Sequence, residues 1–317
     1  MSGVTYFEGI VVGALQGVSE LFPVSSLGHS ILLPAWVGGS WATDLSMGEG
    51  SPYLAVLVAM HVATALALVL FFWRDWVRIV RGLLTSIRDR SVTTPDQRLA
   101  WLLVIATIPV GIAGLLLDKV VQEYLGKPVP AAIFLILNGA VLYAVEWFGR
   151  GGHDDTGGPE PVLATETTID FSAQPTMPMR AIRVEEASDM RLSQLRISQA
   201  VVIGAAQIFA LLPGISRSGS TIVAGLRQRL SHEDAARFAF LLATPVILAA
   251  GVLKMPSLLK PAAHSSLGPA IVGSLVAFVA AYLSVRFLVS YFETRTLTPF
   301  AIYCAIAGAA SLVYFTL

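Results

Sequence analysis

Six uninterrupted apolar stretches, each long enough to cross a lipid bilayer, limit what this 317-residue chain can fold into. A membrane-spanning α-helix needs about 20 mainly apolar residues. Six segments meet this length, at about 53–73, 99–117, 131–148, 235–253, 269–289 and 298–317. Only 13% of the residues are charged, against about 25% in soluble domains. We therefore expect an all-α polytopic membrane protein with six transmembrane helices.

Two further apolar segments, at residues 4–37 and 199–226, are each interrupted by a polar break. The first break reads ELFPVSSLGHS and the second reads LLPGISRSGST. Irregular backbone at membrane depth is tolerated only where protein buries it or where it lines an aqueous cavity. Each segment is therefore expected to form a re-entrant pair of half-helices that enters the bilayer and turns back.

The two broken segments resemble each other. A shift of 191 residues places GALQGVSELFPVSSLGHSI, from Gly13, over GAAQIFALLPGISRSGSTI, from Gly204, without a gap. Each copy precedes three expected spanning helices, and an odd number of crossings inverts the second copy. This pattern predicts inverted-topology repeats, with a polar site at their interface near the bilayer midplane. The expected units are an N-terminal repeat at 1–148, a flexible linker at 149–198 and a C-terminal inverted repeat at 199–317.

Charge indicates the orientation of the chain. Arginines concentrate in the loop 74–98 and in the linker 149–198, whereas the opposite loops contain no arginine and four lysines, at positions 119, 127, 254 and 260. The positive-inside rule then places the linker on the cytoplasmic side of the membrane, with the spanning helices in contact with membrane lipids. The formal net charge is zero, so we expect no nucleic-acid partner.

The first break carries a carboxylate, an amide, two hydroxyls and an imidazole. Gln16 and Glu20 are four residues apart and share one helix face, and their oxygens suit a divalent cation such as Mg²⁺ or Ca²⁺. A helix-packing hydrogen bond is the alternative role for Gln16. Ser25, Ser26 and His29 begin the second half-helix, whose N-terminus favours an anion. Ser25 could instead serve only as the helix N-cap.

The second break carries a guanidinium among hydroxyls. Arg217 is the only Lys or Arg outside the loops, and its planar fork matches phosphate oxygens. The alternative is that Arg217 only pairs with Glu20. Small and hydroxyl-bearing residues around it would complete a phosphate cradle: Ser216, Ser218, Gly219 and Thr221.

Together the two breaks predict a phosphate-ester or diphosphate site inside a lipid phase, and hence a lipid substrate with a phosphorylated head. His61 lies in the middle of the first expected spanning helix. For His61 we favour interhelical packing over a direct role in the chemistry.

These motifs resemble those of the bacterial undecaprenyl-diphosphate phosphatases, also called bacitracin-resistance proteins. The family pattern [E/Q]-x-x-x-E, then P-V-S-S-x-G-H, and later P-G-x-S-R-S-G stands here at 16–20, 23–29 and 213–219. Gln16 stands where many members have Glu, and Leu27 stands where many have Thr. The resemblance implies hydrolysis of undecaprenyl diphosphate to undecaprenyl phosphate, with a divalent cation held by Glu20 and Gln16.

The resemblance also implies that His29 and Ser26 serve the chemical step and that Ser216 and Arg217 hold the diphosphate. Three routes stay open: Ser26 activated by His29, direct attack by His29, or attack by a metal-bound water near Glu20. A transporter or flippase for a phosphorylated polyprenyl lipid is the alternative function, because broken helices in inverted repeats are typical of transporters. The resemblance implies location in a bacterial plasma membrane, and the site is expected to open to the outer leaflet. The oligomeric state stays open, with a homodimer as one alternative.

Overall fold

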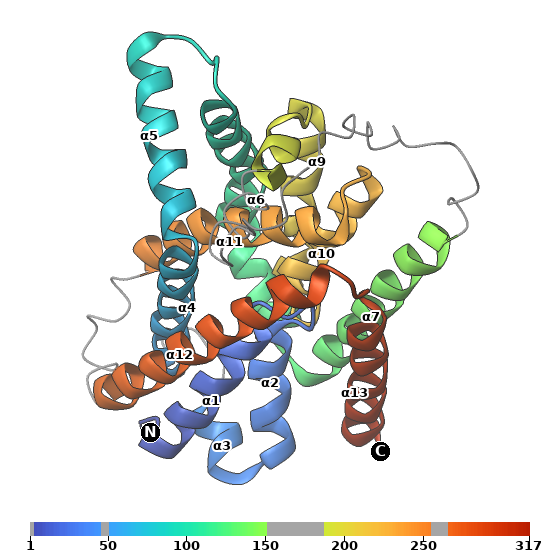
Figure 1. Cartoon of the computed structure of the whole chain (residues 1–317). Helices are drawn as coiled ribbons and strands as arrows, with labels where there is room; N and C mark the ends of the chain where they lie inside the picture. The colour runs from blue at the N-terminus through green and yellow to red at the C-terminus, as the bar shows by residue number, and fades with distance from the viewer. Residues whose placement is uncertain (1–2, 46–50, 151–186, 255–265) are drawn as a thin grey trace, which may run out of the picture.

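The computed structural model describes residues 3–45, 51–150, 187–254 and 266–317, and their regular structure is helical throughout (Figure 1). Six helices in these ranges are long and apolar enough to span a membrane, which confirms the six segments predicted from the sequence. They are α4 (Pro52–Phe71), α6 (Pro95–Leu125), α7 (Pro128–Arg150), α11 (His232–Lys254), α12 (Leu267–Phe292) and α13 (Thr298–Thr316).

The ends of these helices follow local chemistry. α6 begins with a capping box, in which the Thr94 hydroxyl accepts from Gln97 N while the Gln97 side chain accepts from the backbone of Thr94. A proline occupies the first turn of α4, α6 and α13, where its missing N–H costs nothing. The apolar stretches therefore begin as helices close to where the sequence places them.

Both broken segments form two helical parts separated by a short irregular stretch. The first consists of α1 (Tyr6–Ser19) and α2 (Ser26–Val37), followed by the short α3 (Gly39–Asp44). The second consists of α9 (Ile197–Ala206) with the 3₁₀ turn η1 (Gln207–Leu211), and then α10 (Arg217–Arg227). Each irregular stretch contains a proline, which removes a backbone donor and interrupts the helix.

Helix α5 (Trp73–Asp89) continues from α4 and packs against the first turns of α6. Its buried side carries Ile79, Gly82 and Ser86, and the Trp101 indole of α6 donates to the Ser86 hydroxyl at 2.9 Å. The other face leaves Leu84 and Ile87 exposed. The loop expected at 74–98 is therefore largely an amphipathic helix.

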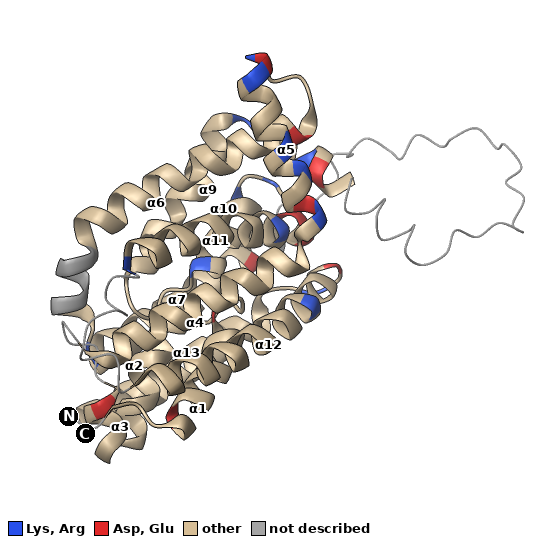
Figure 2. Cartoon of the chain, turned by 90° about the vertical axis from the view of Figure 1, so that its left-hand side faces the viewer, with Lys and Arg blue, Asp and Glu red and all other residues tan. Residues whose placement is uncertain are grey.

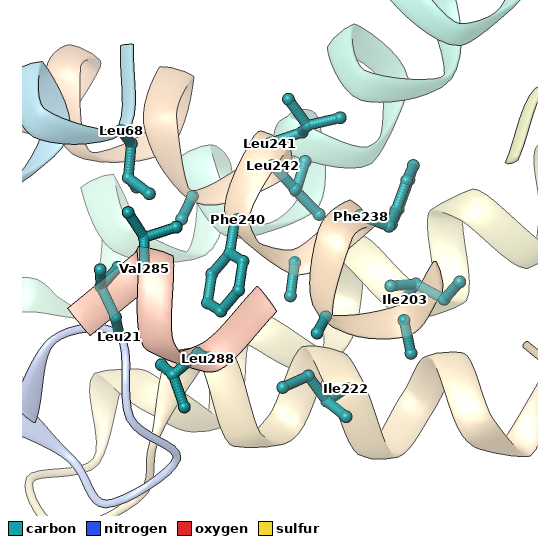
Figure 3. Close-up of a cluster of buried hydrophobic side chains, with 14 of the residues drawn as sticks. Leu21, Leu68, Ile203, Ile222, Phe238, Phe240, Leu241, Leu242, Val285 and Leu288 are labelled. Carbon is teal, nitrogen blue, oxygen red and sulfur yellow. The ribbon is translucent and has the colours of Figure 1, made fainter. Parts of the chain in front are cut away.

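Helix α11 forms the centre of the bundle. The part of α11 that qualifies as a membrane span is 61% buried, against 28% for α13. Figure 3 shows Phe238, Phe240 and Leu242 of α11 surrounded by side chains from other helices, among them Ile222 of α10 and Val285 of α12. The second broken segment therefore packs on this central helix through α10.

Small residues let the broken segments approach spanning helices closely. A Cβ atom on Gly13 of α1 would lie 2.2 Å from the carbonyl oxygen of Gly273 in α12. A Cβ atom on Gly204 of α9 would lie 2.0 Å from the carbonyl oxygen of Ala106 in α6. Small residues at such crossings are how membrane helices gain packing energy.

Many of the charged residues lie at the end of the bundle that holds α5 (Figure 2). Asp189 lies 2.6 Å from Arg78 and 3.0 Å from Arg237, and Arg237 also pairs with Asp75 at 3.0 Å. Asp189 belongs to a helix at residues 187–193. The C-terminal end of the segment predicted as a flexible linker is thus helical and held by ion pairs, while residues 151–186 lie outside the described ranges.

Candidate active site

The two broken segments meet at their irregular stretches. The Ser25 hydroxyl accepts hydrogen bonds from Gly28 N at 3.2 Å and from Gly214 N at 3.1 Å, so it caps α2 and ties it to the other break. Gly214 has φ +112°, and a Cβ atom there would lie 2.4 Å from the carbonyl oxygen of Ala131. Only glycine fits this crossing without strain.

Ser25 itself lies in an unusual backbone conformation. Its φ is 71° and its ψ is 101°, a region in which a residue with a side chain costs about 1–3 kcal/mol. The two hydrogen bonds to its hydroxyl hold it there. The structural role that the sequence offered as an alternative for Ser25 is therefore present, and the same residue also lines the cavity described below.

Asn138 of α7 forms hydrogen bonds to both irregular stretches, a role that was not predicted from the sequence. Its amide nitrogen donates to Pro23 O at 2.9 Å and its amide oxygen accepts from Ser216 N at 3.0 Å. The Asn138 side chain is 3% exposed. In the sequence, the signal for this role is an asparagine within a mainly apolar stretch that is expected to span the membrane.

Glu20 lies at the C-terminal end of α1 and is the centre of the polar site. Its Oε2 atom accepts from Gln16 Nε2 at 2.8 Å and from the Ser26 hydroxyl at 2.5 Å. His61 Nε2 of α4 lies 3.3 Å from the same oxygen. Because the Glu20 side chain is only 3% exposed, its charge is held by these neighbours rather than by water.

The other oxygen of Glu20 receives the guanidinium predicted from the second break. Arg217 Nη2 forms a hydrogen-bonded ion pair with Glu20 Oε1, although 197 residues separate the two along the chain. Arg217 is the first residue of α10, directly after the Ser216 cap. The pair therefore joins the two broken segments through opposite charges.

These side chains line one cavity of about 270 Å³. Of the residues predicted for the site, Glu20, Ser25, Ser26, Ser216 and Arg217 line it. The remaining wall is mostly apolar and comes from α4, α6, η1 and α11, with Leu54, Val58, Val110, Leu211 and Ile247 among its residues. A charged and hydroxyl-rich patch thus lies beside an apolar surface.

Four other predicted residues lie next to this group but do not line the cavity. Gln16 contacts Glu20 from α1. The hydroxyls of Ser218 and Thr221 donate to backbone carbonyls, of Phe22 at 3.1 Å and of Arg217 at 2.8 Å. The backbone N–H of Gly219 donates to Ser216 Oγ at 3.1 Å. The second break is therefore a cap and a packed turn in which Ser216 and Arg217 face the cavity.

The His29 side chain is not brought to Glu20 or to the Ser26 hydroxyl. Its Nδ1 lies 2.7 Å from the Ser25 carbonyl oxygen, and its Nε2 lies 2.7 Å from the Tyr303 hydroxyl of α13. A carbonyl can only accept, so Nδ1 carries a hydrogen, and in the neutral ring Nε2 accepts from Tyr303. The ring also stacks on Tyr303. Both nitrogens of His29 are therefore engaged outside the cavity.

Polar residues that were not predicted for the site also line the cavity, and His61 and Gln207 are two of them. His61, for which packing was favoured, contacts Glu20 as described. Gln207 is 1% exposed, and neither polar atom of its amide finds a hydrogen-bond partner among the described residues. Gln207 matches Gln16 in the alignment of the two broken segments. This equivalence is the feature of the sequence that points to Gln207 as a site residue.

The described lining of the cavity offers a divalent cation one carboxylate ligand, that of Glu20. Among the described residues, no three His, Cys, Asp or Glu side chains are grouped so that they could hold a metal ion. Gln16 Oε1, however, is buried without a partner in the described part of the chain while its Nε2 is bonded to Glu20. An orphaned carbonyl oxygen beside a carboxylate fits a hard cation whose remaining ligands are water and substrate oxygens.

Comparisons with known proteins identify relatives that match nearly the whole chain. An undecaprenyl-diphosphatase of Mycolicibacterium paratuberculosis is 59% identical over 99% of this chain and 98% of the relative. Undecaprenyl-diphosphatase 2 of Frankia alni is 50% identical over the full length of both chains. An undecaprenyl-diphosphatase of Acidiphilium cryptum is 40% identical over 96% of each.

The family model described as bacitracin resistance protein BacA matches residues 9–310. This range contains both polar breaks, almost all of α1 and most of the last spanning helix. Since the match covers almost the whole chain, it includes the elements that carry the cavity. The chain therefore belongs to the bacitracin resistance protein family.

Proposed function

We propose that this chain is an integral membrane phosphatase that hydrolyses undecaprenyl diphosphate to undecaprenyl phosphate and inorganic phosphate, recycling the lipid carrier of cell-wall precursors. The meeting of Arg217 with Glu20 and Ser26 in one cavity of a membrane-embedded bundle carries the proposal. The relatives named undecaprenyl-diphosphatase support it over nearly the full chain.

Arg217 is assigned to the diphosphate. Its guanidinium can form two parallel charge-assisted hydrogen bonds to phosphate oxygens. In the free site it pairs with Glu20, so substrate binding exchanges a carboxylate for phosphate and releases Glu20 to act as a base. The apolar wall beside it, with Leu54, Val58 and Ile247, suits the part of the polyprenyl chain next to the head group.

Ser26 is assigned as the nucleophile and Glu20 as its base, because the Ser26 hydroxyl already donates to Glu20 at 2.5 Å. Glu20 takes the hydroxyl proton as Ser26 Oγ bonds to the terminal phosphorus. The bond from that phosphorus to the bridging oxygen breaks, and undecaprenyl phosphate leaves with the electron pair. Water then attacks the phosphoserine, which releases inorganic phosphate and restores the hydroxyl. Arg217 stabilises charge on the phosphoryl oxygens.

His29 has a supporting role in this proposal. Its two nitrogens are engaged by Ser25 O and Tyr303, so it fixes the backbone of the first turn of α2, which carries Ser26. The route in which His29 activates Ser26 and the route in which His29 itself attacks would both require the ring to leave these partners.

A Mg²⁺ or Ca²⁺ ion remains part of the proposal. Glu20 and Gln16 would hold it, since the Gln16 carbonyl oxygen has no partner among the described residues. Such an ion supplies charge neutralisation to phosphoryl oxygens. The chain's own contribution is to hold the carboxylate in place through Gln16 and Ser26, and through Arg217 until substrate binds.

Inverted repeats would explain how the site is assembled. Ser25 and Ser216 are equivalent in the alignment, and each caps its half-helix by accepting from the N–H of the residue three positions later. Gly13 and Gly204 are also equivalent, and each packs its first half-helix on the backbone of the second spanning helix of the other repeat. These matched contacts support two re-entrant pairs related by inversion, in the units 1–148 and 199–317.

The cavity is proposed to open toward the outer leaflet, with the linker in the cytoplasm. Gly126 and Lys254 line the cavity, and both stand at ends of spanning helices on the side whose loops carry few cations. Because one chain supplies all of these lining residues, the proposed reaction requires no homodimer.

The test is release of inorganic phosphate from undecaprenyl diphosphate by purified, tag-free protein in detergent, with and without Mg²⁺ or Ca²⁺. Turnover in detergent supports hydrolysis, because no membrane separates two compartments there. The transporter alternative predicts no phosphate release in detergent and movement of the phosphorylated lipid between leaflets of proteoliposomes. That pair of results would overturn the proposal.

A further inference from the structure

Helix α4 places a histidine against the carboxylate of the cavity. His61 Nε2 lies 3.3 Å from Glu20 Oε2. The His61 side chain is 29% exposed, and it lines the cavity together with Glu20 and Ser26. The chemistry proposed above gives this side chain no task.

The other ring nitrogen of His61 determines which tautomer faces the carboxylate. His61 Nδ1 lies 2.8 Å from the carbonyl oxygen of Leu57, and a carbonyl can only accept a hydrogen bond. Nδ1 therefore carries the hydrogen, and the neutral ring presents the lone pair of Nε2 to Glu20 Oε2. Two lone pairs facing each other repel, so this arrangement favours a positive centre between them, which can be a proton on Nε2 or a metal ion. A ring N–H bonded to a backbone carbonyl is also the usual support of a metal-binding histidine.

The separation of the two atoms suits a metal ion as that centre. Two ligands that each lie about 2.1 Å from one ion are about 3.0 Å apart in octahedral geometry and about 3.4 Å apart in tetrahedral geometry. The observed distance between His61 Nε2 and Glu20 Oε2 is 3.3 Å. Gln16 Oε1 on the neighbouring helix is buried without a partner in the described part of the chain. The imidazole nitrogen and the carboxylate oxygen thus lie at a separation that one ion can bridge, and the unpartnered amide oxygen belongs to the residue whose Nε2 donates to the same carboxylate.

The other described histidine–carboxylate pair does not share these features. His232 Nε2 lies 2.7 Å from Glu146 Oε1, which is the length of a direct hydrogen bond. The same Glu146 oxygen also accepts from Leu297 N at 2.8 Å. His232 and Glu146 do not line the cavity. This pair serves as an internal comparison for a histidine that bonds to its carboxylate directly.

We propose that His61 is a nitrogen ligand of the divalent cation in this site, with Glu20 as the carboxylate ligand and Gln16 as the amide ligand. The proposal rests on the cation of the proposed function and adds an imidazole to its oxygen ligands. An imidazole raises the affinity for transition metals more than for Mg²⁺ or Ca²⁺. The site of this chain therefore prefers Mn²⁺ to both.

The test is pulsed electron paramagnetic resonance of Mn²⁺ bound to the purified full-length protein, prepared without a histidine tag and without substrate. A histidine ligand gives the bound Mn²⁺ a ¹⁴N modulation, which oxygen ligands do not. The wild-type protein is compared with His61→Gln, which keeps a polar side chain in the cavity, and with the matched control His232→Gln. Titration with Mn²⁺ and with Mg²⁺ gives the two affinities for each variant.

The wild type and His232→Gln should show one bound Mn²⁺ with ¹⁴N modulation, and His61→Gln should lose the modulation. His61→Gln should also bind Mn²⁺ at least about 10-fold more weakly, with a smaller change for Mg²⁺. Bound Mn²⁺ without ¹⁴N modulation in the wild type would overturn the proposal, as would modulation that persists in His61→Gln or the absence of Mn²⁺ binding. Phosphate release alongside any of these results would leave the hydrolase function standing, so the two failures are distinguishable.

Discussion

Arg217 and Glu20, which are 197 residues apart in the sequence, form an ion pair that joins the two broken helical segments at the cavity. The Glu20 side chain is 3% exposed and the Arg217 side chain 17%. A pair shielded to this degree is stable only while both charges are present. The same contact therefore holds the two segments together and keeps the phosphate-binding guanidinium in place.

Ser26→Ala should abolish phosphate release, because the proposed nucleophile is removed. Rapid quenching of the wild-type reaction followed by mass spectrometry of peptides should find phosphate on Ser26. Ser30→Ala is the matched control, since the Ser30 hydroxyl donates to the Ser26 carbonyl and lies outside the cavity. This variant should retain activity within a few-fold. Phosphate on His29, or full turnover by Ser26→Ala, would contradict the assignment.

Gln207→Leu should raise the KM for undecaprenyl diphosphate while stabilising the free protein. Both amide atoms of Gln207 are buried without a partner among the described residues, and such atoms cost about 1–3 kcal/mol each. A lipid head group in the cavity can satisfy them, whereas the leucine side chain removes the cost in the free state. Steady-state kinetics and thermal unfolding in detergent measure the two effects. An unchanged KM would remove Gln207 from the binding site.

Gly204→Ala should destabilise the protein by about 1–3 kcal/mol through overpacking, because the new Cβ atom would lie 2.0 Å from Ala106 O. Gly13→Ala should behave alike, since its Cβ atom would meet Gly273 O at 2.2 Å. Gly111→Ala is the control, because a Cβ atom there meets nothing within 4 Å. Thermal unfolding in one detergent compares the three variants. Equal stability of all three would argue against the matched packing of the two repeats.

Asp189→Asn should lower the free energy of unfolding by about 3 kcal/mol. The change leaves the buried Arg237 with less compensation and removes the 2.6 Å contact to Arg78, and breaking a buried ion pair costs about 3–5 kcal/mol. Asp89→Asn is the control, because the Asp89–Arg88 pair is exposed and such pairs are worth about 0–1 kcal/mol. A small effect at Asp189 would show that the helix at 187–193 is not anchored by these charges.

The spanning helices could be predicted from the sequence because hydrophobic length alone decides whether a segment crosses a bilayer. The breaks could be predicted because Pro23 and Pro213 interrupt apolar segments. Pairing with Glu20 was one of the two roles predicted for Arg217, the other being phosphate binding, since a buried guanidinium requires an anion. These predictions depend on residue type and on spacing along the chain.

Other features depend on how helices face one another, which the sequence does not encode locally. His29 lies near Ser25 and Ser26 in sequence, but its ring is oriented toward Tyr303. His61 was assigned to packing, although α4 presents it to Glu20. Asn138 reaches both breaks from a third helix. The helix at 187–193 forms where the sequence shows no sustained apolar period, because its ion pairs come from distant segments.

The most direct measurement of the central claim is a double-mutant cycle between Glu20→Gln and Arg217→Gln, read out as kcat/KM for phosphate release. Each single substitution should reduce it by more than about 100-fold. Because the two residues act in one site, the double variant should be about as slow as the slower single variant. Losses that multiply, or near-wild-type turnover in either single variant, would show that Arg217 and Glu20 do not form one catalytic site.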